Sequence, residues 1–291
     1  MTTIHEHRLE LAGFGTRALE LDPAPTGDAA PLLLIHGFGD SADTWRLLMA
    51  RLARRGRHAL ALDLPGFGRA SRLDREEAVL PQLDRFVAAA VERVAKGRDG
   101  GVVIAGNSLG GCMALRAAER DGLPLAGIVP IAPAGLEHAR WLRIIEGERL
   151  VRLLMRAPVP IPEPVVRGIV GRAYRSLAFA HPRTVDGAVV SAFASHVSSR
   201  RDVIRVLRTG HRLMPELGCP FRLDRIACPV LMVWGDSDRM VFATGAERVL
   251  RAVSGSRIVM IERCGHCPQI EAPDRLASLL HSFPAELARA A

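Results

Sequence analysis

Short, fully apolar runs alternate along this chain with longer segments whose apolar residues recur every three or four positions. Such runs suit strands that are buried on both faces of a parallel sheet, and the longer segments have the periodicity of amphipathic helices. The runs lie at residues 31–35, 59–62, 102–104, 127–131, 230–234 and 258–261, and the helical segments at 44–55, 82–95, 109–120, 245–253 and 274–289. This alternation predicts an α/β fold with helices on both faces of the sheet.

The first strands follow a different pattern. Residues 7–11 and 16–21 alternate polar and apolar side chains and are separated by Ala-Gly-Phe-Gly, which is typical of a β-hairpin at a sheet edge. With the six apolar runs, the hairpin gives a mostly parallel sheet of eight strands.

The strand pattern stops after Gly135. From about residue 137 to 227 the sequence favours helices, and we expect an inserted helical cap between two parts of the core, 1–136 and 228–291. The chain has 39 basic and 31 acidic residues, and the cap segment holds 16 arginines against 8 acidic residues. The excess positive charge therefore lies in the cap.

The first helical pattern of the cap, residues 141–155, interleaves apolar side chains with arginines. Such a helix can lie weakly on an anionic lipid interface, or it can close its apolar side over a substrate pocket. The second interpretation is favoured and makes Trp141 a candidate substrate-binding residue.

Targeting signals and disulfide patterns are not evident. The start of the chain does not resemble a signal peptide, and no apolar stretch reaches the length that spans a membrane. Five cysteines in 291 residues do not suggest a disulfide framework. We therefore expect a cytoplasmic protein.

A serine follows the buried run at 102–104 directly, in Gly106-Asn107-Ser108-Leu109-Gly110. A strand, a tight turn and a helix in this order form a nucleophile elbow, which requires small residues two positions before and after the serine. The motif is short, but its position between strand and helix makes Ser108 the candidate nucleophile.

A serine hydroxyl needs a general base, and the base needs an acid to orient it. His266 follows the last apolar run and lies at the same sheet edge as the elbow. Two carboxylates, Asp236 and Asp238, follow the preceding run; an aspartate beside a glycine often serves its own turn, so we expect Asp238 to be the acid. The order Ser108, Asp238, His266 is that of the α/β-hydrolase arrangement.

Acyl transfer also requires hydrogen-bond donors for the oxyanion. His36-Gly37-Phe38-Gly39 follows the strand at 31–35, which is the position of such a donor loop. We expect the backbone N–H groups of Phe38 and Leu109 to form the oxyanion hole, and His36 to be a structural residue of the loop.

Taken together, these motifs resemble the α/β-hydrolase superfamily, and in particular its capped serine hydrolases. The stretches LLLIHGFG, LDLPGFG, GNSLGG, VLMVWGDSDRMV and CGHCPQIEAP occur in family order and cover about two-thirds of the chain. The resemblance implies a Ser108–Asp238–His266 triad with Phe38 and Leu109 as oxyanion donors. It also implies that the cap selects the substrate.

The resemblance favours a small-molecule ester as substrate. Epoxide hydrolases and haloalkane dehalogenases have an aspartate at the position of Ser108. C–C bond hydrolases of ring-fission products share the GNSxGG elbow, but a tryptophan commonly follows their histidine, and here that residue is Cys267. Pro133-Ala134-Gly135 resembles monoacylglycerol-lipase-like esterases and indicates a hydrophobic acyl group. C–C hydrolysis, cofactor-free perhydrolysis and a hydrolase-fold receptor remain alternatives.

No cofactor or metal is expected. Cys264 and Cys267 have the spacing of a metal or redox pair, but His266 between them is assigned to the triad and no second cysteine pair is near in sequence. The Gly66-Phe67-Gly68 segment lacks the third glycine of a dinucleotide loop. With 4% aromatic residues and scattered arginines, the chain does not match a nucleic-acid-binding module.

Overall fold

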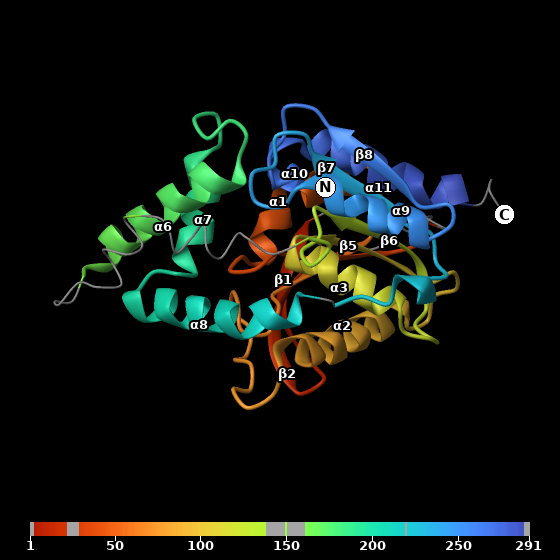
Figure 1. The fold of residues 1–291 in the computed structure, drawn as a ribbon, viewed down its shortest axis with the longest axis horizontal. Helices are drawn as coiled ribbons and strands as arrows, with labels where there is room; N and C mark the ends of the chain where they lie inside the picture. Colours follow the sequence, from red (N-terminus) through yellow and green to blue (C-terminus); the bar gives the residue numbers. More distant parts are fainter. Residues whose placement is uncertain (1–2, 22–28, 138–148, 150–160, 219, 288–291) are drawn as a thin grey trace.

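The predicted eight-stranded sheet is present in the computed structural model, which describes residues 3–21, 29–137, 149, 161–218 and 220–287 (Figure 1). The strand order is β1-β2-β4-β3-β5-β6-β7-β8; β2 is antiparallel to both of its neighbours and the other pairs are parallel. The strands are β1 (Ile4–Leu11), β2 (Phe14–Leu21), β3 (Leu32–Ile35), β4 (Ala59–Leu62), β5 (Val102–Asn107), β6 (Leu125–Ile131), β7 (Leu231–Gly235) and β8 (Arg257–Ile261).

The edge hairpin turns through two residues. Ala12 has a φ of 50° and Gly13 a φ of 81°. A two-residue turn with two positive φ angles matches the right-handed twist of antiparallel strands. The expected β1–β2 hairpin therefore forms at one edge of the sheet.

Helices cover both faces of the sheet. Leu33 and Ile35 of β3 pack in one apolar core with α2 and α3, whereas Leu32 and Leu34 pack in a second core with α1 and α11. Successive side chains of a strand point to opposite faces, so a continuous apolar run fills both cores. The core helices are α1 (Arg46–Ala53), α2 (Val79–Ala95), α3 (Leu109–Ala118), α9 (Ala246–Ala252), α10 (Pro268–Glu271) and α11 (Pro273–Leu287), with short 3-10 helices η1 (Ala42–Trp45), η2 (Leu223–Arg225) and η3 (Ala243–Gly245).

Every described secondary-structure element between β6 and β7 is a helix, and loops join these helices. The segment contains α6 (Glu163–Ala178), α7 (Gly187–Ser195) and α8 (Arg200–Glu216), which lie together at the left of Figure 1. The cap boundaries at 137 and 227 stay a prediction. Trp141 and most of the pattern at 141–155 fall outside the described residues.

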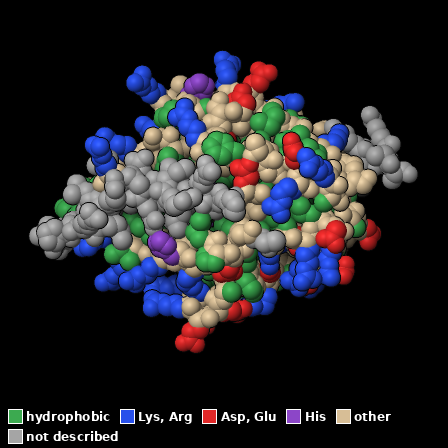
Figure 2. Space-filling model, in the orientation of Figure 1, with side chains coloured by type: hydrophobic (Ala, Val, Ile, Leu, Met, Phe, Trp, Pro, Cys, Tyr) green, Lys and Arg blue, Asp and Glu red, His purple; other side chains and the backbone are tan. Residues whose placement is uncertain are grey.

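Basic side chains are spread over the face drawn in Figure 2, with acidic ones among them, and a dense group lies at lower left, along α8. This helix contributes five arginines, at 200, 201, 205, 208 and 212. Among the described residues, no helix combines the length and the apolar character that crossing a membrane requires.

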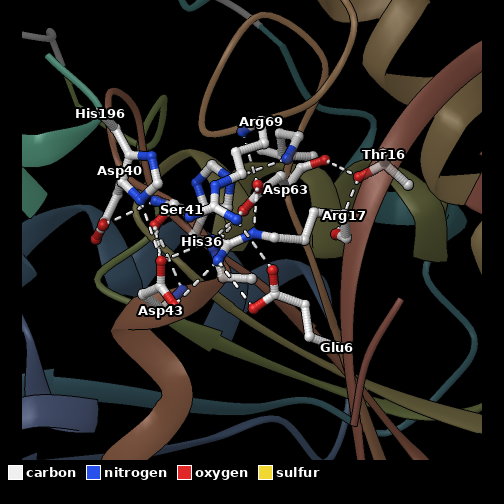
Figure 3. Close-up of polar contacts among 12 residues, drawn as sticks. Glu6, Thr16, Arg17, His36, Asp40, Ser41, Asp43, Asp63, Arg69 and His196 are labelled. Carbon is white, nitrogen blue, oxygen red and sulfur yellow. Dashed lines mark hydrogen bonds and ion pairs between the residues drawn. The ribbon is translucent and has the colours of Figure 1, made fainter. Parts of the chain in front are cut away.

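A buried ionic cluster joins the edge hairpin to the loop after β3 (Figure 3). The guanidinium of Arg17, which is 4% exposed, donates to Asp63 with Nε at 3.0 Å and to Asp43 with Nη2 at 2.7 Å. The carboxylate of Asp63 also accepts the backbone N–H groups of Ala42 and Arg69, each at 2.7 Å. Although burial alone would raise it, the pKa of Asp63 is lowered by the hydrogen bond from Arg17. Asp63 thus connects β2, η1 and the loop after β4.

Replacing Asp63 with Ala should lower the free energy of unfolding by about 3 kcal/mol, because Arg17 keeps a buried charge with one carboxylate fewer and two backbone donors lose their acceptor. Urea denaturation followed by circular dichroism measures the change. As a control, Glu247→Ala removes an exposed pair with Arg251 and should change stability by less than about 1 kcal/mol. Equal effects of the two substitutions would contradict this role of the cluster.

Candidate active site

The turn after β5 has the strained geometry expected of a nucleophile elbow. Ser108 has φ 54° and ψ −110°, between the end of β5 and the first residue of α3. Its N–H donates to the carbonyl of Ile131 at 2.8 Å. A Cβ at Gly106 would collide with the carbonyl of Gly110, and one at Gly110 would collide with the carbonyl of Ile35. Glycine is therefore required on both sides of Ser108.

His266 and Asp238 are in contact, as the sequence predicted. His266 Nδ1 lies 2.7 Å from Asp238 Oδ2, and the residues are 4% and 8% exposed. The other carboxylate oxygen of Asp238 accepts the backbone N–H groups of Met240 at 2.8 Å and Val241 at 3.1 Å. With Nδ1 occupied by the carboxylate, Nε2 is the nitrogen of His266 that remains for a second partner.

Asp236 was expected to bond the backbone of its own turn, but its carboxylate instead joins that turn to the loop after β8. Its Oδ1 accepts the Ser237 hydroxyl at 2.8 Å and the backbone N–H of Cys264 at 3.4 Å. The carboxylate that contacts His266 is that of Asp238.

The loop that carries His266 is fixed from both sides. Its N–H donates to the carbonyl of Ala178, at the end of α6, at 2.8 Å, and its carbonyl accepts the Asn107 amide at 2.9 Å. Asn107 precedes Ser108 directly, and its Oδ1 accepts Gln269 Nε2 at 3.2 Å. The insertion and the elbow therefore both position the histidine.

Ser108 and His266 line the same cavity, together with Gly37, Phe38 and Gly39. The hydrogen bonds of the described residues do not include one from the Ser108 hydroxyl to His266. Catalytic hydrogen bonds are often long without substrate and tighten when substrate binds. A Cβ at Gly37 would lie 3.2 Å from that of Ser108, so the loop after β3 approaches the serine closely. Leu109, whose N–H is the other expected oxyanion donor, is the first residue of α3.

His36 is structural, as expected. It is fully buried; Nδ1 donates to the carbonyl of Gly37 at 2.7 Å and Nε2 accepts the N–H of Leu64 at 2.8 Å. Both nitrogens are occupied by one donor and one acceptor, which fits the neutral ring. Burial lowers the pKa of His36 to about 4, so the ring stays neutral near pH 7.

The wall of the cavity is mostly aliphatic and aromatic. Its apolar side chains come from α6, α7, α8 and the loops after them and after β7: Val170, Ala173, Leu177, Ala178, Phe193, Val197, Val203, Val206, Leu207 and Met240. Among the described lining residues there is no lysine or arginine.

Two further residues of the cavity, Asp40 and Tyr174, were not assigned from the sequence. Asp40 is 6% exposed and lines the cavity two residues after Phe38; burial raises its pKa to about 7 against hydrogen bonds from Ser41 and Thr44. Tyr174 of α6 lies with its hydroxyl 3.8 Å from Cys267 Sγ. In the sequence, Asp40 directly follows the donor loop, and Tyr174 is the single tyrosine of the chain. Neither feature indicates that the side chain would be buried in the site.

The described residues do not form a metal-binding group. Within the described ranges, no three His, Cys, Asp or Glu residues are arranged to hold a metal ion. Cys264 and Cys267 are free thiols whose pKa values are raised by burial.

The chain belongs to the alpha/beta hydrolase family, whose sequence model matches residues 32–279. Monoacylglycerol lipase abhd6-A of Xenopus laevis is 23% identical over 274 residues, which are 90% of this chain and 77% of the lipase. The 2-hydroxy-6-oxononadienedioate/2-hydroxy-6-oxononatrienedioate hydrolase of Klebsiella pneumoniae is 26% identical over 285 residues, 95% of this chain and 93% of that protein.

Solved structures share the fold. A crystal structure of a membrane phospholipase A, described as a bacterial virulence factor, matches with a TM-score of 0.74 at 25% identity and covers 99% of this chain and 87% of its own. A serine hydrolase involved in carbazole degradation matches with a TM-score of 0.75 at 23% identity, over 98% and 100% of the two chains. The relatives confirm the expected superfamily and a hydrolase fold.

Replacing Gly106 with Ala should sharply lower the melting temperature and hydrolase activity, because the new methyl group has no room against the carbonyl of Gly110. Gly168 of α6 is the matched control, since a Cβ there meets nothing within 4 Å. Gly168→Ala should raise the stability by up to about 1 kcal/mol, because alanine favours helix more than glycine. Thermal unfolding of the two variants tests this, and a stable, active Gly106→Ala variant would contradict it.

Proposed function

We propose that this protein is a serine hydrolase that cleaves carboxylic esters with a hydrophobic acyl group through an acyl-enzyme on Ser108. The observation that carries the proposal is the 2.7 Å contact of Asp238 with His266, which lines the same cavity as the strained Ser108. A carboxylate bonded to Nδ1 fixes the tautomer in which Nε2 can accept a proton.

The proposed first half-reaction forms the acyl-enzyme. Ser108 Oγ attacks the ester carbonyl while His266 Nε2 takes its proton, and Asp238 stabilises the imidazolium. The backbone N–H groups of Phe38 and Leu109 stabilise the oxyanion, which in such sites contributes about 3 kcal/mol for each donor. The C–O bond then breaks, and His266 gives its proton to the leaving alcohol.

In the second half-reaction, water replaces the serine as nucleophile. His266 accepts a proton from the water, which attacks the acyl carbonyl, and the Ser108 oxygen leaves and regains a proton from His266. The carboxylic acid is released, and no cofactor is required for either half-reaction.

The charge of the cavity supports an ester over a ring-fission product. The relatives named as dienedioate and dienoic acid hydrolases act, by those names, on carboxylic acids. A buried carboxylate substrate requires a cationic or strongly donating partner. The described cavity lining offers no lysine or arginine, and it adds the carboxyl group of Asp40.

The sequence arguments for location and partners belong to the same proposal. A cytoplasmic enzyme fits the small number of free cysteines, and weak contact with anionic lipid fits an arginine-rich insertion.

Ser108→Ala should keep the fold and reduce kcat/KM for p-nitrophenyl esters by about five orders of magnitude, since a triad acts as a unit. Steady-state rates and near-ultraviolet circular dichroism measure the two effects. The exposed Ser254→Ala is the control and should be fully active. Undiminished turnover in Ser108→Ala would refute the assignment.

Activity against p-nitrophenyl esters should increase with acyl length from acetate as the chain fills the apolar cavity, because each buried methylene contributes about 0.8 kcal/mol. The same preparation is assayed with a ring-fission dienoate, which should react more slowly. A faster dienoate reaction would favour C–C hydrolysis. One stoichiometric release of p-nitrophenol without turnover would favour a receptor.

A further inference from the structure

A buried carboxyl group next to the proposed catalytic residues has no ionic partner among the residues that the structure describes. Asp40 is 6% exposed and lines the cavity beside Ser108. Its Oδ1 accepts the backbone N–H of Ser41 at 2.8 Å, and no lysine, arginine or histidine in the described part of the chain forms an ion pair with it. The function proposed above leaves this group without a role.

The neighbouring charged cluster does not neutralise Asp40. Asp43 binds Arg17 at 2.7 Å, Arg46 at 2.7 Å and the His196 ring at 3.1 Å, so both guanidinium groups are already engaged. Figure 3 shows the carboxyl group of Asp40 at the edge of the cluster, turned away from Arg17. Asp40 is therefore the carboxyl group of this region that remains uncompensated.

Asp40 lies on the side of the cavity where the leaving group should be. It acts electrostatically on Tyr174 and Cys267, and the Tyr174 hydroxyl is 3.8 Å from the Cys267 sulfur. Cys267 follows His266, which would protonate the departing alcohol. The alcohol part of a bound ester would therefore approach Asp40. The acyl chain would pack against the aliphatic side chains of α6 and α8.

Aromatic rings complete this side of the cavity. Tyr174 and Phe193 are stacked, with ring centroids 3.6 Å apart and an angle of 5° between the planes. Both rings and Asp40 line the cavity of Ser108 and also an adjoining cavity beside η1 and α7. A carboxylate together with aromatic rings is a combination that attracts ammonium groups, through charge and through the ring quadrupole.

We propose that Asp40 forms an alcohol-side subsite that selects esters whose alcohol part carries an ammonium group, as in an amino-alcohol ester. This inference rests on the ester hydrolysis proposed above and names its substrate class. A bound cation supplies the ionic partner that the described residues do not provide. The same carboxylate disfavours anionic esters.

The preference should depend on pH. Burial raises the pKa of Asp40 to about 7. Asp43, His196, Tyr174 and Cys267 are the titratable groups that act on Asp40 from the surrounding elements. Below its pKa Asp40 is neutral and attracts a cation weakly, and above it the carboxylate is charged. The selectivity for cationic esters should therefore rise as the pH increases through about 7.

The test compares two esters of equal size, butyrylcholine and its neutral isostere, in which a tert-butyl group replaces the trimethylammonium group. The readout is the ratio of their kcat/KM values from pH 5 to 9, in which effects on the shared catalytic steps cancel. For the native protein the ratio should be about tenfold or more at high pH, equivalent to one charge contact of about 1.4 kcal/mol, and lower at acidic pH.

Asp40→Asn should bring the ratio down to about its acidic value and remove its pH dependence, because asparagine keeps an acceptor for the Ser41 N–H but has no charge. Asp274→Asn is the matched control: its side chain is 69% exposed on α11, and its loss makes the same change in net charge. This control should keep the native ratio and pH profile.

Two outcomes separate this inference from the proposed function. A ratio close to one, or a ratio that Asp40→Asn leaves unchanged while the neutral ester is still cleaved, would overturn the ammonium subsite alone. If neither ester is turned over in a reaction that depends on Ser108, the ester hydrolysis itself fails.

Discussion

The arrangement of the candidate active site depends on the hydrogen bonds that the carboxylate of Asp63 accepts. This carboxylate is fully buried at the end of β4 and accepts hydrogen bonds from Arg17, from Ala42 and from Arg69. Through these bonds one side chain connects the edge hairpin, the start of η1 and the loop after β4. A Cβ on Gly68 would lie almost on this carboxylate, so a glycine is required there. The loop with Phe38 and Asp40 lies between β3 and η1. The end of this loop at η1 is therefore held by the buried carboxylate of Asp63.

On the histidine side of the site, uncharged side chains add to the contacts made by the carboxylates of Asp238 and Glu271. The Gln269 side-chain amide donates to Thr44 and to Asn107, each at 3.2 Å, and Asn107 in turn binds the backbone carbonyl of His266. These bonds connect η1, the elbow and the loop after β8 in one buried network. Buried hydrogen bonds of this kind are strengthened by the low dielectric around them. The Gln269 Oε1 atom, which is also buried, has no hydrogen-bond partner among the described residues. Rigidity at His266 thus depends on residues of three separate loops.

The fold and the contact between Asp238 and His266 were predictable because their signals are local. An apolar run of four or five residues indicates a buried strand without reference to the rest of the chain, and parallel strands bring their following loops to one edge. The burial of Asp40 was not predictable in this way, since it requires Tyr174 and Phe193 from the insertion to cover it. Arg17 did offer a signal: it shares a face of β2 with Leu19 and Leu21, which are fully buried, so a charge there requires partners. The identity of those partners, Asp43 and Asp63, depends on chain packing over long sequence distances.

Burial in a low dielectric determines the behaviour of both the paired carboxylates and the unpaired carboxylate near the proposed nucleophile. Burial in apolar surroundings strengthens the interaction of Asp238 with His266 and the effect of backbone donors on a developing oxyanion. Burial also makes a charge without a partner unfavourable. Arg17 is the partner of Asp43 and Asp63, and two backbone N–H groups and an imidazole are the partners of Asp238. Asp40 receives a backbone hydrogen bond from Ser41, a side-chain hydrogen bond from Thr44 and no cation from the described residues. The pKa of Asp40 is raised because burial disfavours its charged form and no cation compensates for it. A cationic ligand would stabilise that charged form and a neutral ligand would not, so Asp40 can discriminate between them.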